Sequence, residues 1–186
     1  MEDAPLDIQW VEDDSFSCSE VVIGVGHLGS SFLMSQFKEK SLIGSIQARG
    51  GDSCKIYRIS TEPHSLILAT SERDISPQNT FQFTSTLFHK IQFKRVLIFS
   101  SFPEFKIQKA YPTVSSPCLR LLRTRACPST LSIPLLEPPL LIENLSASLL
   151  THCELRNLEA YLFLSIEEAQ PHLSALSAFD PVLASF

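Results

Sequence analysis

The sequence predicts a single α/β domain with a mainly parallel central sheet and helices on both faces. Three apolar runs, at residues 20–25, 95–100 and 159–166, are continuous enough for strands that are buried on both faces. Amphipathic segments lie between these runs, and strands that alternate with helices favour a parallel sheet covered on both sides. With 186 residues, 44% of them hydrophobic and 19% charged, the chain suits one domain spanning residues 1–186. We expect frayed ends at residues 1–6 and 181–186.

The first half of the chain predicts five strands and two helices. Polar and apolar residues alternate from Asp7 to Val11, which indicates a half-buried strand, and Gly50-Gly51-Asp52 indicates a turn. Ser76-Pro77 predicts the start of a helix, because serine caps helices and proline fits the first helical position. That helix is expected to carry four apolar residues mainly on one side: Phe81, Leu87, Phe88 and Ile91. The strands are expected at residues 7–11, 20–25, 42–47, 55–59 and 66–68, and the other helix at 30–37.

The second half predicts strands at residues 95–100 and 159–166 and three helices. Ser116-Pro117 has the same serine–proline pattern and predicts a helix that carries Leu119, Leu122 and Arg123. Four prolines between residues 127 and 139 exclude a regular helix there. Asn144 suits the cap of the next helix, in which apolar residues recur at every fourth position. These are Leu145, Leu149 and Cys153, and a last helix is expected at residues 170–179.

Targeting signals and cysteine usage predict a protein of the cytoplasm or the nucleus. The N-terminal Met1-Glu2-Asp3-Ala4-Pro5 has neither the basic nor the apolar region of a secretory signal. No run approaches eighteen apolar residues, so we expect no membrane-spanning helix. The five cysteines are odd in number and scattered, which favours reduced thiols over a disulfide framework.

Charge is segregated along the chain, although the net charge is only −5. Residues 1–20 hold seven acids and no base, residues 90–125 hold eight bases against Glu104, and residues from 126 onward hold seven acids against Arg156. Two interpretations stay open: the charges balance on solvated faces of the folded chain, or the basic middle is offered to an acidic protein surface. A pI near 5.5 without an aromatic-studded basic motif disfavours nucleic-acid binding.

The run Gly24-Val25-Gly26-His27-Leu28-Gly29 matches a dinucleotide fingerprint between a predicted strand and a predicted helix. In that motif the glycines admit a pyrophosphate, and an acid about twenty residues later binds the ribose. Asp52 is near that distance, and Arg49 would alternatively face a 2′-phosphate. The alternative function is therefore an NAD(P)-binding oxidoreductase. The competing hypothesis is a strand-to-helix turn that needs glycine for its backbone angles.

The sequence assigns no catalytic, cofactor-binding or metal-binding residue. It contains no C-x-x-C, no histidine pair four residues apart and no G-x-S-x-G elbow. His152 and Cys153 are adjacent, so on one helix they diverge by about 100° and do not easily share an ion.

Several segments of the second half follow a known pattern. They are residues 116–124, 134–139 and 145–153, then Ala160-Tyr161-Leu162-Phe163-Leu164 and, more weakly, Phe179-Asp180-Pro181. Together with the strand-turn-helix at residues 20–32, these segments resemble the proteasome assembly chaperone 1 family over about two thirds of the chain.

The resemblance implies an α/β protein that is a non-enzymatic chaperone and needs no cofactor. Such proteins pair with proteasome assembly chaperone 2 and hold the α-subunits of the 20S core while the α-ring forms. They also block off-pathway association of rings. In that family the turn at residues 24–29 is not a dinucleotide fingerprint.

The C-terminal tail departs from the family's pattern. Chaperones of this group commonly end in a hydrophobic residue, a tyrosine and any residue, which enter a pocket between α-subunits. This chain ends Leu183-Ala184-Ser185-Phe186, with serine in place of the tyrosine. Leu183 and Phe186 are the residues of this tail that we expect to contact a partner, and a frayed terminus is the alternative.

Overall fold

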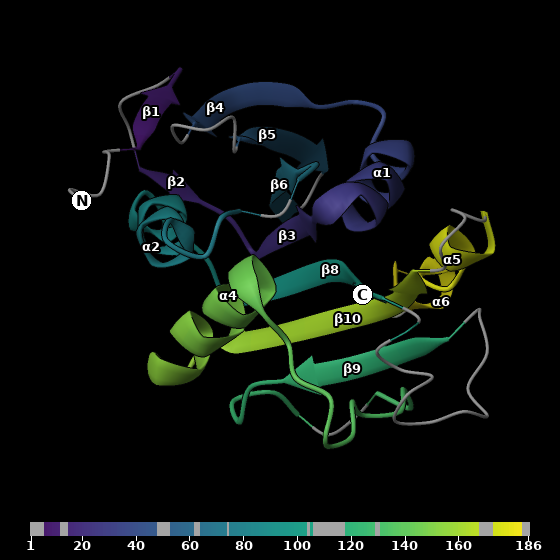
Figure 1. The fold of residues 1–186 in the computed structure, drawn as a ribbon. Helices are drawn as coiled ribbons and strands as arrows, with labels where there is room; N and C mark the ends of the chain where they lie inside the picture. Colours follow the sequence, from purple (N-terminus) through teal and green to yellow (C-terminus); the bar gives the residue numbers. More distant parts are fainter. Residues whose placement is uncertain are drawn as a thin grey trace.

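One eight-stranded mixed sheet organises the computed structural model, which describes residues 6–11, 15–47, 53–61, 64–73, 75–103, 105, 118–128, 131–167 and 173–183 (Figure 1). A short parallel pair lies beside it, formed by β2 (Phe16–Ser17) and β7 (Ile91–Gln92). In spatial order the large sheet contains β1 (Asp7–Trp10), β4 (Ser41–Gln47), β5 (Ser53–Thr61), β6 (His64–Ser71), β3 (Glu20–Val25), β8 (Arg95–Pro103), β10 (Glu159–Glu167) and β9 (Leu119–Arg123).

Four central strands, β6, β3, β8 and β10, run parallel to one another. Arg95 begins β8 and is in register with Glu20 of β3 on one side and Glu159 of β10 on the other. The Arg95 guanidinium forms an ion pair with Glu20. This pairing joins the acidic N-terminal part of the chain to its basic middle at the amino end of the parallel strands.

The flanks of the sheet are antiparallel, so the prediction of a mainly parallel sheet was wrong. Among the described strands, β1–β4, β4–β5, β5–β6 and β10–β9 are antiparallel pairs, against three parallel pairs in the centre. Five residues separate β4 from β5, and two separate β5 from β6. A parallel connection needs a crossover of a dozen or more residues, whereas such short connections join antiparallel neighbours.

The five described helices cover both faces of the sheet, as the sequence predicts (Figure 1). The helices α2 (Thr80–His89) and α4 (Asn144–Leu155) pack against each other on one face. On the other face, α1 (Gly26–Gln36) packs near the short helices α5 (Leu173–Ser177) and α6 (Asp180–Leu183). None of the helices in the described ranges is long and apolar enough to cross a membrane.

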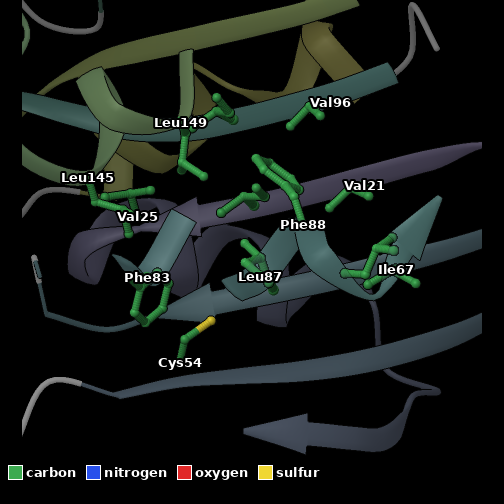
Figure 2. Close-up of a cluster of buried hydrophobic side chains, with 14 of the residues drawn as sticks. Val21, Val25, Cys54, Ile67, Phe83, Leu87, Phe88, Val96, Leu145 and Leu149 are labelled. Atoms are coloured by element: carbon green, nitrogen blue, oxygen red, sulfur yellow. The ribbon is translucent and has the colours of Figure 1, made fainter. Parts of the chain in front are cut away.

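Two hydrophobic cores fill the space between the sheet and its helices. Strand β3 serves both, because Val21, Ile23 and Val25 point to one face and Val22 to the other. The core beneath α2 and α4 gathers Phe83, Leu87 and Phe88 with strand side chains that include Val21, Cys54, Ile67 and Val96 (Figure 2). The helix residues Leu145, Leu149 and Cys153 are 1%, 0% and 0% exposed, which confirms their predicted spacing on α4. The opposite core contains an aromatic group formed by Phe32, Phe99 and Phe179.

The predicted helix after Ser116-Pro117 was wrong, because residues 119–123 form the edge strand β9. Leu121 is 1% exposed and lies opposite Phe163 of β10, and its backbone N–H donates to the Pro134 carbonyl oxygen while its carbonyl oxygen accepts from the Leu136 N–H. Leucine and arginine favour helices, but pairing with a neighbouring strand overrides that local preference. Residues 116 and 117 themselves lie outside the described residues.

Other helix boundaries differ from the predicted ones by a few residues. Helix α1 begins at Gly26 instead of residue 30, so it starts inside the glycine motif. Helix α2 begins at Thr80, because Ser76 and Pro77 belong to a turn in which Asn79 donates backbone and side-chain hydrogen bonds to Ser76. Glu143, and not Asn144, is the cap residue of α4.

Two positions near the chain ends are buried in the structure. Leu6 is 8% exposed and Val182 is 0% exposed, so these two positions are buried although they fall within the ranges expected to fray. The predicted turn at residues 50–52 and the remainder of the two end ranges, 1–5 and 184–186, lie outside the described residues.

Candidate functional site

Close packing of α1 on the sheet explains the glycine motif. A Cβ on Gly29 would stand 2.1 Å from the carbonyl oxygen of Phe99, and one on Gly24 would stand 2.8 Å from the backbone of Ser30. Gly26 starts the helix with φ +73°, a conformation that other residues adopt only with strain. Ser30 fixes the turn further, because its Oγ donates a hydrogen bond to the Gly24 carbonyl oxygen, 3.1 Å away.

The strand order does not suit a dinucleotide at this turn. In the dinucleotide-binding unit, the ribose-binding acid follows the strand that neighbours the glycine-bearing strand. Here the strand after α1 is β4, which is three positions from β3 in the sheet. At about 4.8 Å per strand, the end of β4 is roughly 14 Å from the end of β3. Asp52 and Arg49 lie outside the described residues. The geometry therefore favours the structural turn.

A small pocket of about 320 Å³ lies at the carboxyl ends of β3 and β8, where ligands bind in many open α/β sheets. His27, Ser101 and Glu143 are among its lining residues. Two further lining residues close its floor, because the buried Ser146 Oγ donates a hydrogen bond to Ser100 Oγ over 3.0 Å. The volume is at the lower end of the range for small-molecule sites, and the carboxylate of Glu143 does not suit a phosphate.

All five cysteines are free thiols, as the sequence predicts, and three of them are strongly desolvated. Burial raises the pKa of Cys54 and of Cys153 to about 12, and that of Cys18 to about 11. A thiol with such a pKa is protonated near neutral pH and is therefore a weak nucleophile. Within the described ranges, no group of three or more histidine, cysteine or carboxylate side chains is arranged to hold a metal ion.

Some bases of the middle segment form ion pairs with acids of the two flanking segments in the folded chain. Arg95 pairs with Glu20, and Arg125 Nε lies 2.6 Å from Glu154 Oε1, so two bases of the middle segment reach acids of the two flanking segments. Arg123 donates instead to the Cys127 carbonyl oxygen over 2.9 Å. These contacts favour the interpretation that charges balance in the folded chain. Lys106 and Lys109 lie outside the described residues.

A surface that the sequence does not reveal lies over α2, α4 and β1. Phe81 is 76% exposed and Leu155 is 79% exposed, and Ile8 of β1 is 39% exposed. The sequence places Phe81 on the apolar side of its helix, and this expectation was wrong. Phe81 precedes the buried Phe83 by two residues, which turns the two side chains about 160° apart.

Two grooves flank Phe81. One has a volume of about 550 Å³, lies between β1 and α2, and is lined by Ile8, Trp10 and the solvent side of α2. The other, of about 340 Å³, lies between α2 and α4 and reaches Leu155. We call Ile8, Phe81, Leu155 and these two grooves the Phe81 face. Exposed apolar side chains beside grooves are typical of a binding surface for another protein.

The expected tail contacts are described only at the backbone of Leu183. Leu183 is the last residue of α6, directly after the buried Val182, and Phe186 lies outside the described residues.

Comparisons with known proteins show which family this sequence and fold resemble. The sequence profile described as Proteasome assembly chaperone 4 matches residues 37–186. Proteasome assembly chaperone 1 of Danio rerio is 26% identical over an alignment that covers 97% of this chain and 74% of the relative. The protein of that name in Mus musculus is 28% identical, with 71% of this chain and 47% of the relative covered. The chain thus spans about half to three quarters of the length of these relatives.

Solved structures share the fold at low sequence identity. PbaA of Pyrococcus furiosus, an archaeal homolog of proteasome-assembly chaperone, has a TM-score of 0.68 and 13% identity, and 97% of this chain and 85% of that chain are covered. PbaB of the same organism, an archaeal proteasome activator, has a TM-score of 0.66 and 12% identity, with 96% and 89% covered. The α/β fold with a mixed sheet is therefore that of the assembly-chaperone structures. The chain belongs to the proteasome assembly chaperone family.

Proposed function

We propose that this protein is a non-enzymatic chaperone of 20S proteasome assembly. It pairs with a second assembly chaperone, holds α-subunits while the α-ring forms, and blocks off-pathway association. The observation that carries the proposal is the family match over residues 37–186, which includes most of the sheet and α2 and α4. The buried, protonated thiols and the small pocket agree with a protein that acts through its surfaces.

The partners in this proposal are a protein like proteasome assembly chaperone 2 and the 20S α-subunits. The complex acts in the cytoplasm or the nucleus. Leu183 and Phe186 are the proposed tail contacts, and a chain that lacks residues 184–186 tests Phe186 directly. If that chain recovers α-subunits as well as the full chain does, Phe186 is not a contact.

Co-purification tests the proposal. The tagged chain is expressed in the cells of its own source, and recovered proteins are quantified by mass spectrometry against an unrelated protein with the same tag. We expect enrichment of a related assembly chaperone and of several 20S α-subunits. Recovery of neither above the control would overturn the proposed function.

A further inference from the structure

We propose that the Phe81 face binds an acidic amphipathic helix of a partner protein. This inference rests on the proposed function only in that both require protein binding. It names a surface and the chemistry of its partner, which the family match does not supply. Three observations support it: the shape of the face, its rigidity and its charge.

The shape of the face requires a partner with two rows of apolar side chains. Phe81 lines both grooves and projects between them as a ridge, because its side chain is 76% exposed. A partner that covers the ridge must place apolar groups on both sides of it. An amphipathic helix does so, since its residues at i, i+3, i+4 and i+7 form two adjacent rows about 5–6 Å apart.

The grooves are formed by elements that are fixed before any partner binds. Ser148 of α4 donates a hydrogen bond from Oγ to the Thr80 carbonyl oxygen of α2 over 3.2 Å. The same Oγ lies 2.9 Å from Thr84 Oγ1, with which it shares a second hydrogen bond. Beneath these contacts, Leu87 and Leu149 are fully buried (Figure 2). Because α2 and α4 do not need to move, binding costs little ordering of this chain.

The charge of the face selects an acidic partner. Among the residues that the structure describes, no aspartate or glutamate lines either groove, and each groove carries a cation, Lys90 in the first and Arg156 in the second. Lys90 Nζ also lies 5.6 Å from the ring centre of Trp10, so this cation is held at the groove. A second copy of the chain would bring Lys90 and Arg156 against cations of the same kind. Carboxylates that flank an apolar row match both cations and fix the register of the helix.

The direct probes are two synthetic 18-residue helical peptides, which share one leucine row. One peptide carries glutamates beside that row, and its twin carries lysines at the same places. The full chain, labelled with ¹⁵N, is titrated with each peptide and followed by two-dimensional NMR. We expect the acidic peptide to shift amides of residues 80–90 and 144–156, and to bind at least tenfold more tightly than the lysine twin.

Matched variants distinguish specific binding at this face from nonspecific binding to exposed apolar side chains elsewhere. Phe81→Ser should weaken binding of the acidic peptide at least tenfold, whereas Leu42→Ser, at a site that is 51% exposed on β4 and lines neither groove, should leave it unchanged. The double variant Lys90→Glu with Arg156→Glu should reverse the preference between the peptides. All of these positions except Lys90 are exposed, and circular dichroism checks the fold of each variant.

Several results would overturn the inference: no shifts at millimolar peptide, equal binding of the twin, shifts confined to residues outside α2, α4 and β1, or self-association that Phe81→Ser abolishes. The last result would assign the face to a second copy. These outcomes are independent of co-purification. If α-subunits are recovered but the acidic peptide does not bind, the surface is wrong and the proposed function stands. If the peptide binds as expected but no assembly partner is recovered, the surface stands and the function is wrong.

Discussion

Gly29 of α1 lies against the carbonyl oxygen of Phe99 in β8, so closely that a Cβ on Gly29 would stand 2.1 Å from that oxygen. A backbone carbonyl does not swing aside as a side chain can, so the helix itself would have to move. We expect Gly29→Ala to lower the free energy of unfolding by about 3 kcal/mol. Urea denaturation followed by circular dichroism measures this loss.

Gly26→Ala is the matched control for that substitution. A Cβ on Gly26 would meet nothing within 4 Å, and only its φ of +73° opposes alanine. The cost should therefore be about 1 kcal/mol, the strain of a left-handed backbone in a residue with a side chain. Equal losses in the two variants would contradict the close contact between α1 and β8.

The same geometry predicts that nicotinamide cofactors do not stabilise the protein. A ligand at 100 times its Kd adds about 2.7 kcal/mol to the stability of the state that binds it. Because β4 lies three positions from β3, the strand that follows α1 is not the neighbour of the glycine-bearing strand, as the dinucleotide-binding unit requires. We expect no change in Tm with millimolar NAD or NADP in differential scanning fluorimetry. A clear rise in Tm would restore the dinucleotide hypothesis.

The buried strands could be predicted from sequence because their signal is local. The run at residues 20–25 forms β3 with the predicted bounds, and its apolar side chains are buried on both faces. The antiparallel direction of one flanking pair of strands could also have been predicted from the sequence. The turn signal Gly50-Gly51-Asp52 leaves too short a connection for a crossover, so it indicates an antiparallel neighbour for the strand before it.

The edge strand β9 and the Phe81 face depend on contacts that no local pattern contains. Leu119 and Leu121 pack on one core and Leu122 on the other, as side chains of a strand do, but the same segment satisfies helical spacing, and only pairing with β10 decides between the two. Phe81 is apolar and helical, which predicts burial. Phe81 lines one groove toward β1 and another toward α4, and which side of α2 these elements leave open is a property of the tertiary fold.

Two buried thiols predict a loss of stability in mild alkali. Burial raises the pKa of Cys54 and Cys153 from 9.0 to about 12 in the folded chain. Below pH 9 both states hold the proton, so the stabilising contribution is complete. Between pH 9 and 12 the unfolded chain loses the proton first, and stability falls by about 1.4 kcal/mol per pH unit for each thiol. Urea denaturation at pH 8, 9 and 10 measures this slope.

Cys54→Ala should make that alkaline slope shallower by one thiol's contribution. Ile56→Val is the control, because it alters a fully buried side chain of the same strand without removing a thiol. It should lower stability at every pH and keep the slope of the original chain. An unchanged slope in Cys54→Ala would show that the Cys54 thiol is not held protonated by burial.

His152 predicts that stability falls as the pH is lowered, whereas the two thiols predict that it falls as the pH is raised. It is 9% exposed, its ring centre lies 5.0 Å from that of Phe88, and its pKa is lowered from 6.5 by burial and then by the charge of Arg156. Above pH 6.5 the imidazole is neutral in both states and the stabilising contribution is complete. As the pH falls below 6.5, the unfolded chain takes up the proton first, so stability declines. We expect the midpoint in urea to fall between pH 7 and 5.5, before most carboxylates protonate.

His152→Gln should flatten this decline in stability, while His27→Gln, on the exposed side of α1, should retain it. A decline that persists in His152→Gln would assign the acid sensitivity to another group.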